Sequence, residues 1–491
     1  MKILTLLEKS RDFWFLLFTS FFFFLLRLPS LFEPYWYGDE GIYQTIGIAM
    51  RQGRLLYSGI WDNKPPLLYI LYSIFNSDQF ALRTVSLIFG LLSVFAFFFL
   101  AKKLFKSNKV IYVTAFIFTF LFGIPLIEGN IANAENFMLL PIFTAGLLIF
   151  GSVEQDPKTK RHSLANFRLV TAGFLLSVAF LFKIVAVFDF AAFFLFLIFA
   201  GSLKTVSFNK LFKDLASLIL GFAIPVLVTV LFFIASGSIK DFLSAAFLQN
   251  VGYVSYGNKF IIPQGFLILK LFLLLSLVIL IFFKRKLLGK SSFFILLWLF
   301  FALFNAFFSQ RPYPHYLLVL LPAFILFSGL VFSDKKMKKF YLILFAGIII
   351  LLIKNFSVYG KTPFYYQNFV SFVLGNKNIY SYRAFFDRQT PKDYAIAEFI
   401  INHTTKKDNI FIWGNNAQIY KMVNKLPPGR YTVAYHMASS KKSIDETQKA
   451  FYKGSPKYVI VTSNQNPIPF NLTNYILKIN IGQASIYENI Y

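Results

Sequence analysis

The sequence predicts a polytopic α-helical membrane protein that ends in a small α/β domain. Hydrophobic residues fill 57% of the 491 positions, and charged residues fill only 14%. Apolar runs of spanning length recur along the first three quarters of the chain and stop after Phe356. A helix on the surface of a soluble domain turns polar residues to water, so this much continuous apolar sequence indicates membrane spans.

Windows of about nineteen residues predict eleven spans. They lie near residues 12–31, 79–101, 110–127, 136–151, 169–182, 184–201, 214–236, 264–283, 291–308, 314–332 and 339–356. We therefore expect a transmembrane catalytic domain over residues 1–356, with an extracytoplasmic loop at 33–78.

The basic residues predict the orientation of these spans. Lys and Arg gather at the amino terminus and in alternate connections, near residues 102–109, 158–168, 204–213, 284–290 and 335–339. The positive-inside rule places these segments in the cytoplasm. We expect a multi-pass protein of the plasma membrane, with the amino terminus inside and everything after residue 356 outside. The net charge of +27 then needs no nucleic acid to explain it.

Residues 357–491 have the pattern of a soluble, extracytoplasmic α/β domain. Short buried strands are expected at 409–413 and 457–461, with helices at 395–401 and 417–423. The chain contains no Cys, which excludes disulfides, thiolate nucleophiles and Cys-based metal sites. It also contains no glycine-rich phosphate loop, which argues against a soluble nucleotide as substrate.

The first outer loop carries the residues best suited to chemistry. Asp39 and Glu40 follow the first span within a Tyr, Trp and Gly cluster, where a carboxylate can act as a general base. Lys64 precedes Pro65-Pro66, which fix the backbone and leave a cation able to hold a phosphate. Ordinary solvated acids and a snorkelling lysine are the alternatives. Residues 311–316 (Arg-Pro-Tyr-Pro-His-Tyr) repeat the rigid cationic turn.

Together these motifs resemble a known family. The stretches are 38–43 (Gly-Asp-Glu-Gly-Ile-Tyr), 64–69 (Lys-Pro-Pro-Leu-Leu-Tyr), 133–135 (Asn-Ala-Glu), 182–183 (Phe-Lys), 311–316 and 411–414 (Phe-Ile-Trp-Gly). They are similar to the GT-C membrane glycosyltransferases of the protein-mannosyltransferase and lipid A aminoarabinose-transferase group. The resemblance implies a GT-C fold of about eleven helices, amphipathic helices in the first outer loop, and a polyprenyl-phosphate sugar as donor.

The resemblance also implies roles for individual residues. Asp39 and Glu40 would form the catalytic pair, with Asp39 as base, and Lys64 and Arg311 would bind the donor phosphate. The residues that would shape an acceptor or metal site are Glu135, Asn133, His315, Tyr316 and Tyr43. Structural alternatives exist: Glu135 suits a helix amino terminus, and His315 could serve as an interfacial hydrogen-bonding residue.

The implied reaction is a single displacement with inversion, in which Asp39 takes the proton of the acceptor hydroxyl while the lipid phosphate departs. Loss of one phosphate-binding cation would cost about 2 to 4 kcal/mol. The implied partners are the lipid donor, membrane lipid and an acceptor that is protein, lipid or glycan, without nucleic acid. No cofactor is required by the sequence, and a divalent metal is left open.

Two other functions remain in view at this point. A transporter or lipid flippase would also have many spans, but here the charges gather at the outer loops and no inverted repeat is apparent. A relative of the oligosaccharyltransferases would share a lipid-linked donor. The carboxy-terminal segment has Trp413-Gly414 but lacks the longer Trp-Trp-Asp-Tyr-Gly signature of those enzymes.

Overall fold

The computed structural model describes residues 2–154, 162–203, 207–250, 267–285, 287–308, 313–334, 337–462 and 467–490. The chain forms two compact units. We call them the bundle unit (Met1–Leu28, Val85–Phe232 and Asn250–Thr362) and the sheet unit (Pro29–Thr84, Phe233–Gln249 and Pro363–Tyr491).

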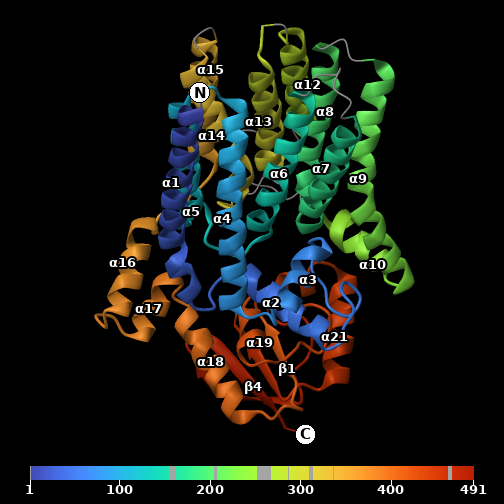
Figure 1. The fold of residues 1–491 in the computed structure, drawn as a ribbon. Coiled ribbons are helices and arrows are strands. Elements are labelled where there is room, and N and C mark those ends of the chain that lie inside the picture. The colour runs from blue at the N-terminus through green and yellow to red at the C-terminus, as the bar shows by residue number, and fades with distance from the viewer. Residues whose placement is uncertain are drawn as a thin grey trace. The chain divides into compact units, whose positions relative to one another are not determined.

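Long apolar helices make up the bundle unit (Figure 1). They are α1 (Lys2–Arg27), α4 (Gln79–Leu104), α5 (Asn108–Gly123), α6 (Ala134–Glu154), α7 (His162–Phe182), α8 (Val187–Leu203), α9 (Phe208–Ala235), α12 (Leu267–Phe283), α13 (Lys290–Phe308), α14 (Tyr316–Ser333) and α15 (Lys338–Asn355), with the short turns η2 (Pro125–Ile127) and η3 (Ile184–Ala186). The first residues of α4 and the last of α9 belong to the sheet unit. Each of the eleven predicted spans coincides with one of these helices.

By length and composition, six helices in the described ranges can cross a membrane. They contain Ser10–Phe32, Gln79–Leu104, Ala134–Val153, Phe208–Ala235, Lys290–Phe308 and Tyr316–Ser333. Shorter apolar helices add to them at Asn108–Gly123, Asn166–Phe182, Ile184–Ala200 and Leu267–Phe283. The prediction of a polytopic helical membrane protein is confirmed.

Phenylalanine serves both the interior and the surface of the bundle unit. Phe97 stacks on Phe118 with ring centroids 4.2 Å apart, whereas Phe232 on α9 is 59% exposed. An apolar side chain that faces outward makes favourable contact with lipid. The buried Asp189 on α8, whose partner the sequence does not indicate, accepts a hydrogen bond of 2.7 Å from the Trp298 indole on α13.

In the sheet unit, short helices surround a small sheet. The helical elements are η1 (Leu28–Phe32), α2 (Gly38–Arg51), α3 (Pro66–Ile74), α10 (Ile239–Leu243), η4 (Ser244–Leu248), α16 (Thr362–Val373), α17 (Ile379–Phe386), α18 (Thr390–His403), α19 (Gln418–Met422), α20 (Ala434–Met437) and α21 (Lys441–Gly454). The helices α2 and α3 lie within residues 33–78, where the family resemblance led us to expect helices. The helices predicted at 395–401 and 417–423 correspond to α18 and α19.

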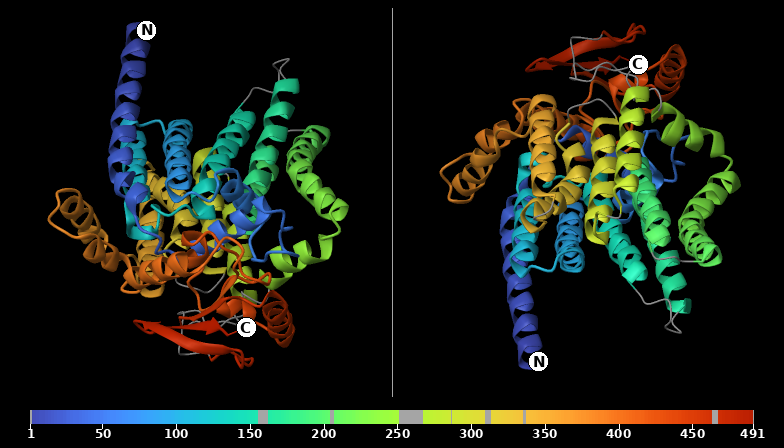
Figure 2. Two further views of the ribbon diagram at one scale, coloured as in Figure 1. Left: turned by 90° about the horizontal axis from the view of Figure 1, so that it is seen from below. Right: turned by 90° about the horizontal axis from the view of Figure 1, so that it is seen from above.

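The sheet has four strands in the order β1-β2-β4-β3. β1 (Ile410–Trp413) and β2 (Tyr458–Val461) are parallel, and β4 (Ala484–Asn489) lies antiparallel between β2 and β3 (Tyr475–Ile481). Helix α21 lies beside the sheet (Figure 2), where Phe451 contacts Phe411 of β1 at a centroid distance of 5.2 Å. Both predicted strands are confirmed, and the β3–β4 hairpin is an addition.

Helix α2 is held tightly against α19 within the sheet unit. A Cβ atom on Gly41 would lie 2.5 Å from the backbone nitrogen of Gln418. One turn further along α2, the Thr45 hydroxyl donates to the carbonyl of Ala417 at 3.1 Å. The absence of a side chain at Gly41 therefore allows the backbones of the two helices to approach this closely.

We predict that Gly41→Ala destabilises the protein. The new methyl group would clash with backbone atoms of α19, which cannot move aside by a change of side-chain rotamer. Overpacking of this kind costs about 1–3 kcal/mol, so the melting temperature in detergent should fall. Gly38→Ala is the matched control, since the nearest atom to its added Cβ is 3.9 Å away. Equal melting temperatures for the two variants would contradict the proposed close approach.

Candidate active site

An ion pair at the start of α2 brings two of the predicted site residues together. The Lys64 ammonium lies 3.3 Å from Asp39 Oδ2. The Tyr43 hydroxyl, one helical turn after Asp39, donates to the same oxygen at 2.9 Å. Lys64 Nζ also lies 4.6 Å from the centroid of the Tyr43 ring. Asp39, Tyr43 and Lys64 thus form one polar cluster.

Two tyrosines fix the turn that carries Lys64. The Tyr57 hydroxyl donates to the Lys64 carbonyl at 2.7 Å, and the Lys64 amide donates to the Tyr69 hydroxyl at 3.2 Å. The Tyr69 hydroxyl in turn donates to Asp62 Oδ2 at 2.7 Å. Pro65, extended at the amino end of α3, completes the turn. The backbone that presents Lys64 is therefore held on both sides.

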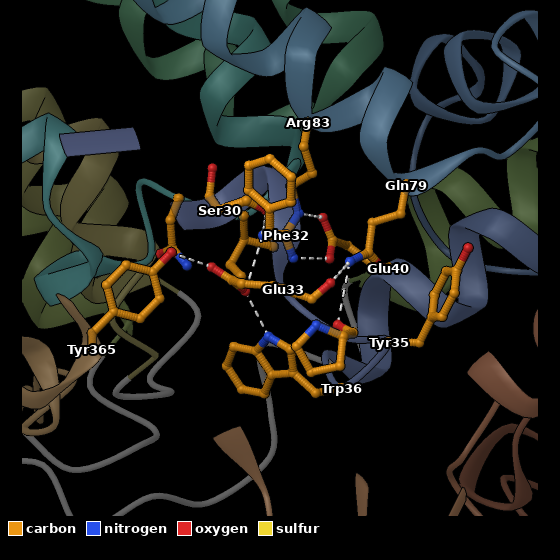
Figure 3. A network of polar contacts seen from close by, with 12 residues as sticks. Ser30, Phe32, Glu33, Tyr35, Trp36, Glu40, Gln79, Arg83 and Tyr365 are labelled. Carbon is orange, nitrogen blue, oxygen red and sulfur yellow. Dashed lines mark hydrogen bonds and ion pairs between the residues drawn. The ribbon is translucent and has the colours of Figure 1, made fainter. Parts of the chain in front are cut away.

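Glu40, unlike its neighbour Asp39, is buried. It belongs to the network of polar contacts in Figure 3. Its carboxylate receives two hydrogen bonds from Arg83, of 2.7 Å and 2.5 Å. Arg83 also pairs with Glu33 at 3.0 Å, and Glu33 accepts further hydrogen bonds from the side chains of Trp36 and Tyr365, each 2.6 Å long. One guanidinium thus binds two buried carboxylates.

Exposure separates the two predicted catalytic carboxylates. The side chain of Asp39 is 37% exposed and that of Lys64 20% exposed, whereas Glu40 is 4% exposed and Arg83 is fully buried. A substrate can reach a group only where its surface is accessible. Asp39 is therefore the carboxylate of this pair that is available for contact with a substrate.

His436 on α20 adds a group that the sequence did not single out. Its ring packs edge-on against Trp61, with centroids 4.8 Å apart, and its Nε2 lies 3.8 Å from Asp62 Oδ1. Burial lowers the pKa of His436 to about 4, an effect that the nearby Asp62 carboxylate opposes. The imidazole is therefore neutral at ordinary pH.

The bundle unit holds a second polar cluster of predicted residues. His315 Nδ1 lies 2.7 Å from Glu128 Oε2, and its Nε2 lies 3.9 Å from Glu135 Oε1. Glu135, in the first turn of α6, also forms an ion pair with Lys183. The Lys183 ammonium stands 4.5 Å from the ring centroid of Tyr316. This cluster joins His315, Tyr316 and Glu135 and supplies Lys183 with a partner.

Two predicted site residues, Asn133 and Arg311, are not assigned to either polar cluster. Asn133 is buried in the connection that precedes α6. Arg311 lies outside the described residues. No group of three or more His, Asp or Glu residues is arranged to hold a metal ion in the part of the chain that the structure describes.

Arg83 and His436 were missed, and the partner of Lys183 was not predicted, because the residues that these three contact are distant in the sequence. Arg83 carried a usable signal: it lies inside the predicted span 79–101, and a cation within a span is a functional or structural candidate by default. His436 carried no such signal, since a single His without a pair at ligand spacing is most often structural.

Comparisons with known proteins support the resemblance. Residues 64–229 match the family model of dolichyl-phosphate-mannose-protein mannosyltransferases. The fold matches ArnT from Cupriavidus metallidurans in the apo state, with a TM-score of 0.60 and 14% identity over 98% of each chain. The predicted resemblance to the mannosyltransferase and aminoarabinose-transferase group is confirmed. The chain is a membrane glycosyltransferase.

Two further structures are similar to this glycosyltransferase. ArnT bound to undecaprenyl phosphate gives a TM-score of 0.57 with 14% identity, over 96% of this chain and 98% of that one. The apo oligosaccharyltransferase of Archaeoglobus fulgidus gives 0.48 with 15% identity, over 91% of this chain and 69% of that one. No curated protein matches the chain in sequence. The enzyme class sets aside the transporter and flippase alternative.

We predict that Arg83→Met strongly destabilises this glycosyltransferase. The substitution leaves Glu33 and Glu40 buried without their cation, and removal of one partner from a buried ion pair costs about 3–5 kcal/mol. The measurement is the melting temperature in detergent. The triple variant Arg83→Met, Glu33→Gln, Glu40→Gln should recover part of the loss, because it removes both uncompensated charges. A single variant as stable as the wild type would overturn this account.

We also predict that His436 makes the protein less stable in acid. Its pKa in the folded state, about 4, lies below the ordinary value of 6.5, so the unfolded chain binds the proton more readily. Its contribution is fully present above pH 6.5 and is lost as the pH falls towards 4, up to about 3 kcal/mol. In His436→Phe, the melting temperature should fall less between pH 7 and 4.5 than in the wild type. Parallel curves would contradict the prediction.

Proposed function

We propose that this glycosyltransferase moves one monosaccharide from a polyprenyl-phosphate donor to an acceptor hydroxyl on the extracytoplasmic face of the membrane. The observation that carries the proposal is the Asp39–Lys64 pair, in which a partly exposed carboxylate and a partly exposed cation lie 3.3 Å apart. A base for the acceptor and a cation for the leaving phosphate are the two groups that this reaction requires. Undecaprenyl phosphate bound to the similar ArnT supports a lipid phosphate as leaving group.

In the proposed reaction, Asp39 accepts the proton of the acceptor hydroxyl. The acceptor oxygen forms a bond to the anomeric carbon, and the bond between that carbon and the phosphate oxygen breaks. Its electron pair leaves with the polyprenyl phosphate, and Asp39 later returns the proton to water. A single displacement inverts the anomeric configuration. No second carboxylic acid is needed, because phosphate leaves as a stable anion, unlike the poor leaving group in glycoside hydrolysis.

Lys64 would couple donor binding to the activation of the base. Its ammonium is paired with Asp39 Oδ2. The donor phosphate is a diester with one negative charge, it gains a second charge as its bond to the sugar breaks, and it competes for the same ammonium. Binding of the donor would therefore draw Lys64 from Asp39 and leave the carboxylate to accept a proton from the acceptor. Tyr43 would keep Asp39 oriented through its 2.9 Å hydrogen bond.

The other predicted residues take supporting parts in this proposal. Glu40 holds the first turn of α2 through Arg83 and so positions Asp39. Arg311 remains a proposed second cation for the phosphate. Glu135, with Asn133, His315 and Tyr316, remains a proposed determinant of the acceptor or of a metal site. The positive-inside pattern supports an amino terminus in the cytoplasm and catalysis on the opposite side.

We expect Asp39→Asn to abolish transfer. Loss of a general base lowers the rate by about 10²–10⁴-fold, whereas the amide leaves Lys64 available for the donor phosphate. The experiment uses purified protein in lipid nanodiscs with a panel of radiolabelled polyprenyl-phosphate monosaccharides. It measures both donor binding and the release of free polyprenyl phosphate, for the wild type and for Asp39→Asn.

The control variants distinguish loss of the base from loss of the phosphate-binding cation and from general damage to the fold. Asp445→Asn, an exposed carboxylate on α21, should behave as the wild type. Lys64→Met should weaken donor binding, which Asp39→Asn should retain. Asp39→Asn with full activity would refute its role as base. Failure of every donor to bind the wild type would refute the lipid-phosphate substrate.

A further inference from the structure

A cavity of about 260 Å³ lies within the sheet unit, next to the turn that carries Lys64. Three segments distant in sequence line it: the turn before α3, helix α10, and the stretch that leads into α21. Its lining includes Trp61, Lys240, Arg430, Tyr431, Ser440 and Lys442. None of these residues has a part in the proposed chemistry.

Ion pairs and hydrogen bonds hold the walls of this cavity in place. The Arg430 guanidinium binds Asp241 Oδ1 at 3.0 Å and Glu446 Oε2 at 2.7 Å. The amide of Trp61 donates to the Arg430 carbonyl at 2.8 Å, and the Tyr431 hydroxyl donates to Glu446 at 3.1 Å. A site built in advance loses little conformational freedom when a ligand binds.

The lining has an excess of positive charge. Of its three cations, Arg430 is neutralised by the carboxylates of Asp241 and Glu446. Lys442 lies only 3.9 Å from Glu446, and its side chain is 82% exposed, while Lys240 is also exposed. Lys240 on α10 and Lys442 on α21 therefore give the cavity its positive field. An anionic group is the ligand that this field favours.

The other lining groups favour a saccharide. The Trp61 ring packs edge-on against the Tyr431 ring at a centroid distance of 5.5 Å, so two aromatic rings stand together at one side. The Tyr431 hydroxyl donates its proton to Glu446, which leaves its oxygen to accept a hydrogen bond, and Gln249 adds a further polar side chain to the lining. Aromatic surface with a few convergent polar groups is typical of small-ligand sites, which usually exceed about 300 Å³. The smaller volume here limits the ligand to about one sugar ring.

We propose that this cavity binds an acidic sugar residue of the acceptor, one that bears a phosphate ester or a carboxylate. The proposal rests on the proposed function, because it assigns the ligand to the acceptor of the same transfer reaction. It restricts that acceptor to an anionic glycan. Lys240 and Lys442 would hold the acidic group, and Trp61 would contact the ring.

Binding to the full-length protein in detergent tests the proposal without any turnover. The probes are glucose 6-phosphate, glucuronic acid, glucose and inorganic phosphate, titrated by saturation-transfer NMR at low and high salt. We expect the two acidic sugars to bind more tightly than both glucose and inorganic phosphate, and to weaken with salt. The comparison of glucose 6-phosphate with glucuronic acid shows which acidic group the cavity prefers.

Two charge reversals on one helix locate the site. Lys442→Glu should weaken binding of the acidic sugars by about fivefold, the usual size of one exposed charge interaction. Lys441→Glu is the matched control, because this exposed neighbour on α21 does not line the cavity. Adding Lys240→Glu to Lys442→Glu should increase the loss. None of these residues acts in the proposed chemistry, so binding of the polyprenyl-phosphate donors should not change.

Three results would overturn the proposal. If acidic sugars bind no more tightly than glucose, the acidic group does not contribute to binding. If inorganic phosphate binds as tightly as glucose 6-phosphate, the sugar ring does not contribute to binding. Equal effects of Lys441→Glu and Lys442→Glu would place binding elsewhere. A wild type that binds acidic sugars but binds none of the polyprenyl-phosphate donors would refute the proposed function and leave the cavity as an acidic-sugar site.

Discussion

The geometry of the candidate active site depends on the buried contact between Arg83 and the carboxylates of Glu33 and Glu40. The full burial of these charges makes them costly unless each is paired, and the planar guanidinium can bind both carboxylates at once. The contact holds the first turn of α2. Successive residues of a helix point about 100° apart, so a Glu40 that faces Arg83 obliges Asp39 to face elsewhere. Asp39 contacts Lys64.

The two ion pairs of this site therefore differ in what they can do. The Arg83 pairs are enclosed, and a change in partner there would expose a charge to a medium of low dielectric constant. The Asp39–Lys64 pair is partly exposed, so water or a substrate phosphate can replace either partner at modest cost. A rigid pair next to an exchangeable pair suits catalysis, because the reacting carboxylate changes partners while the helix that carries it stays in place.

Sequence patterns predicted most helices and strands, but they did not predict which side chains distant in the sequence contact one another. The eleven helices of the bundle unit that coincide with predicted spans, and the strands β1 and β2, follow from continuous apolar runs, a local property of the chain. The β3–β4 hairpin was missed because β3 is largely exposed and lacks a buried apolar pattern. Asp39, Lys64 and Tyr43 were predicted together, since they share one loop. The sequence did not predict that Glu40 is buried and Asp39 is partly exposed, because this difference is set by Arg83, 43 residues beyond Glu40.

The short segment 61–64 links the proposed acceptor cavity to the proposed base. Trp61 lines the cavity, Asp62 binds the hydroxyl of Tyr69, and Lys64 pairs with Asp39. Three residues of extended chain span at most about 11 Å, so an acidic sugar anchored beside Trp61 would lie within one or two sugar rings of Asp39. The tyrosines that fix this segment would then set the register of the acceptor. If both proposals hold, the enzyme selects its acceptor by the distance between an acidic group and the hydroxyl that receives the new sugar.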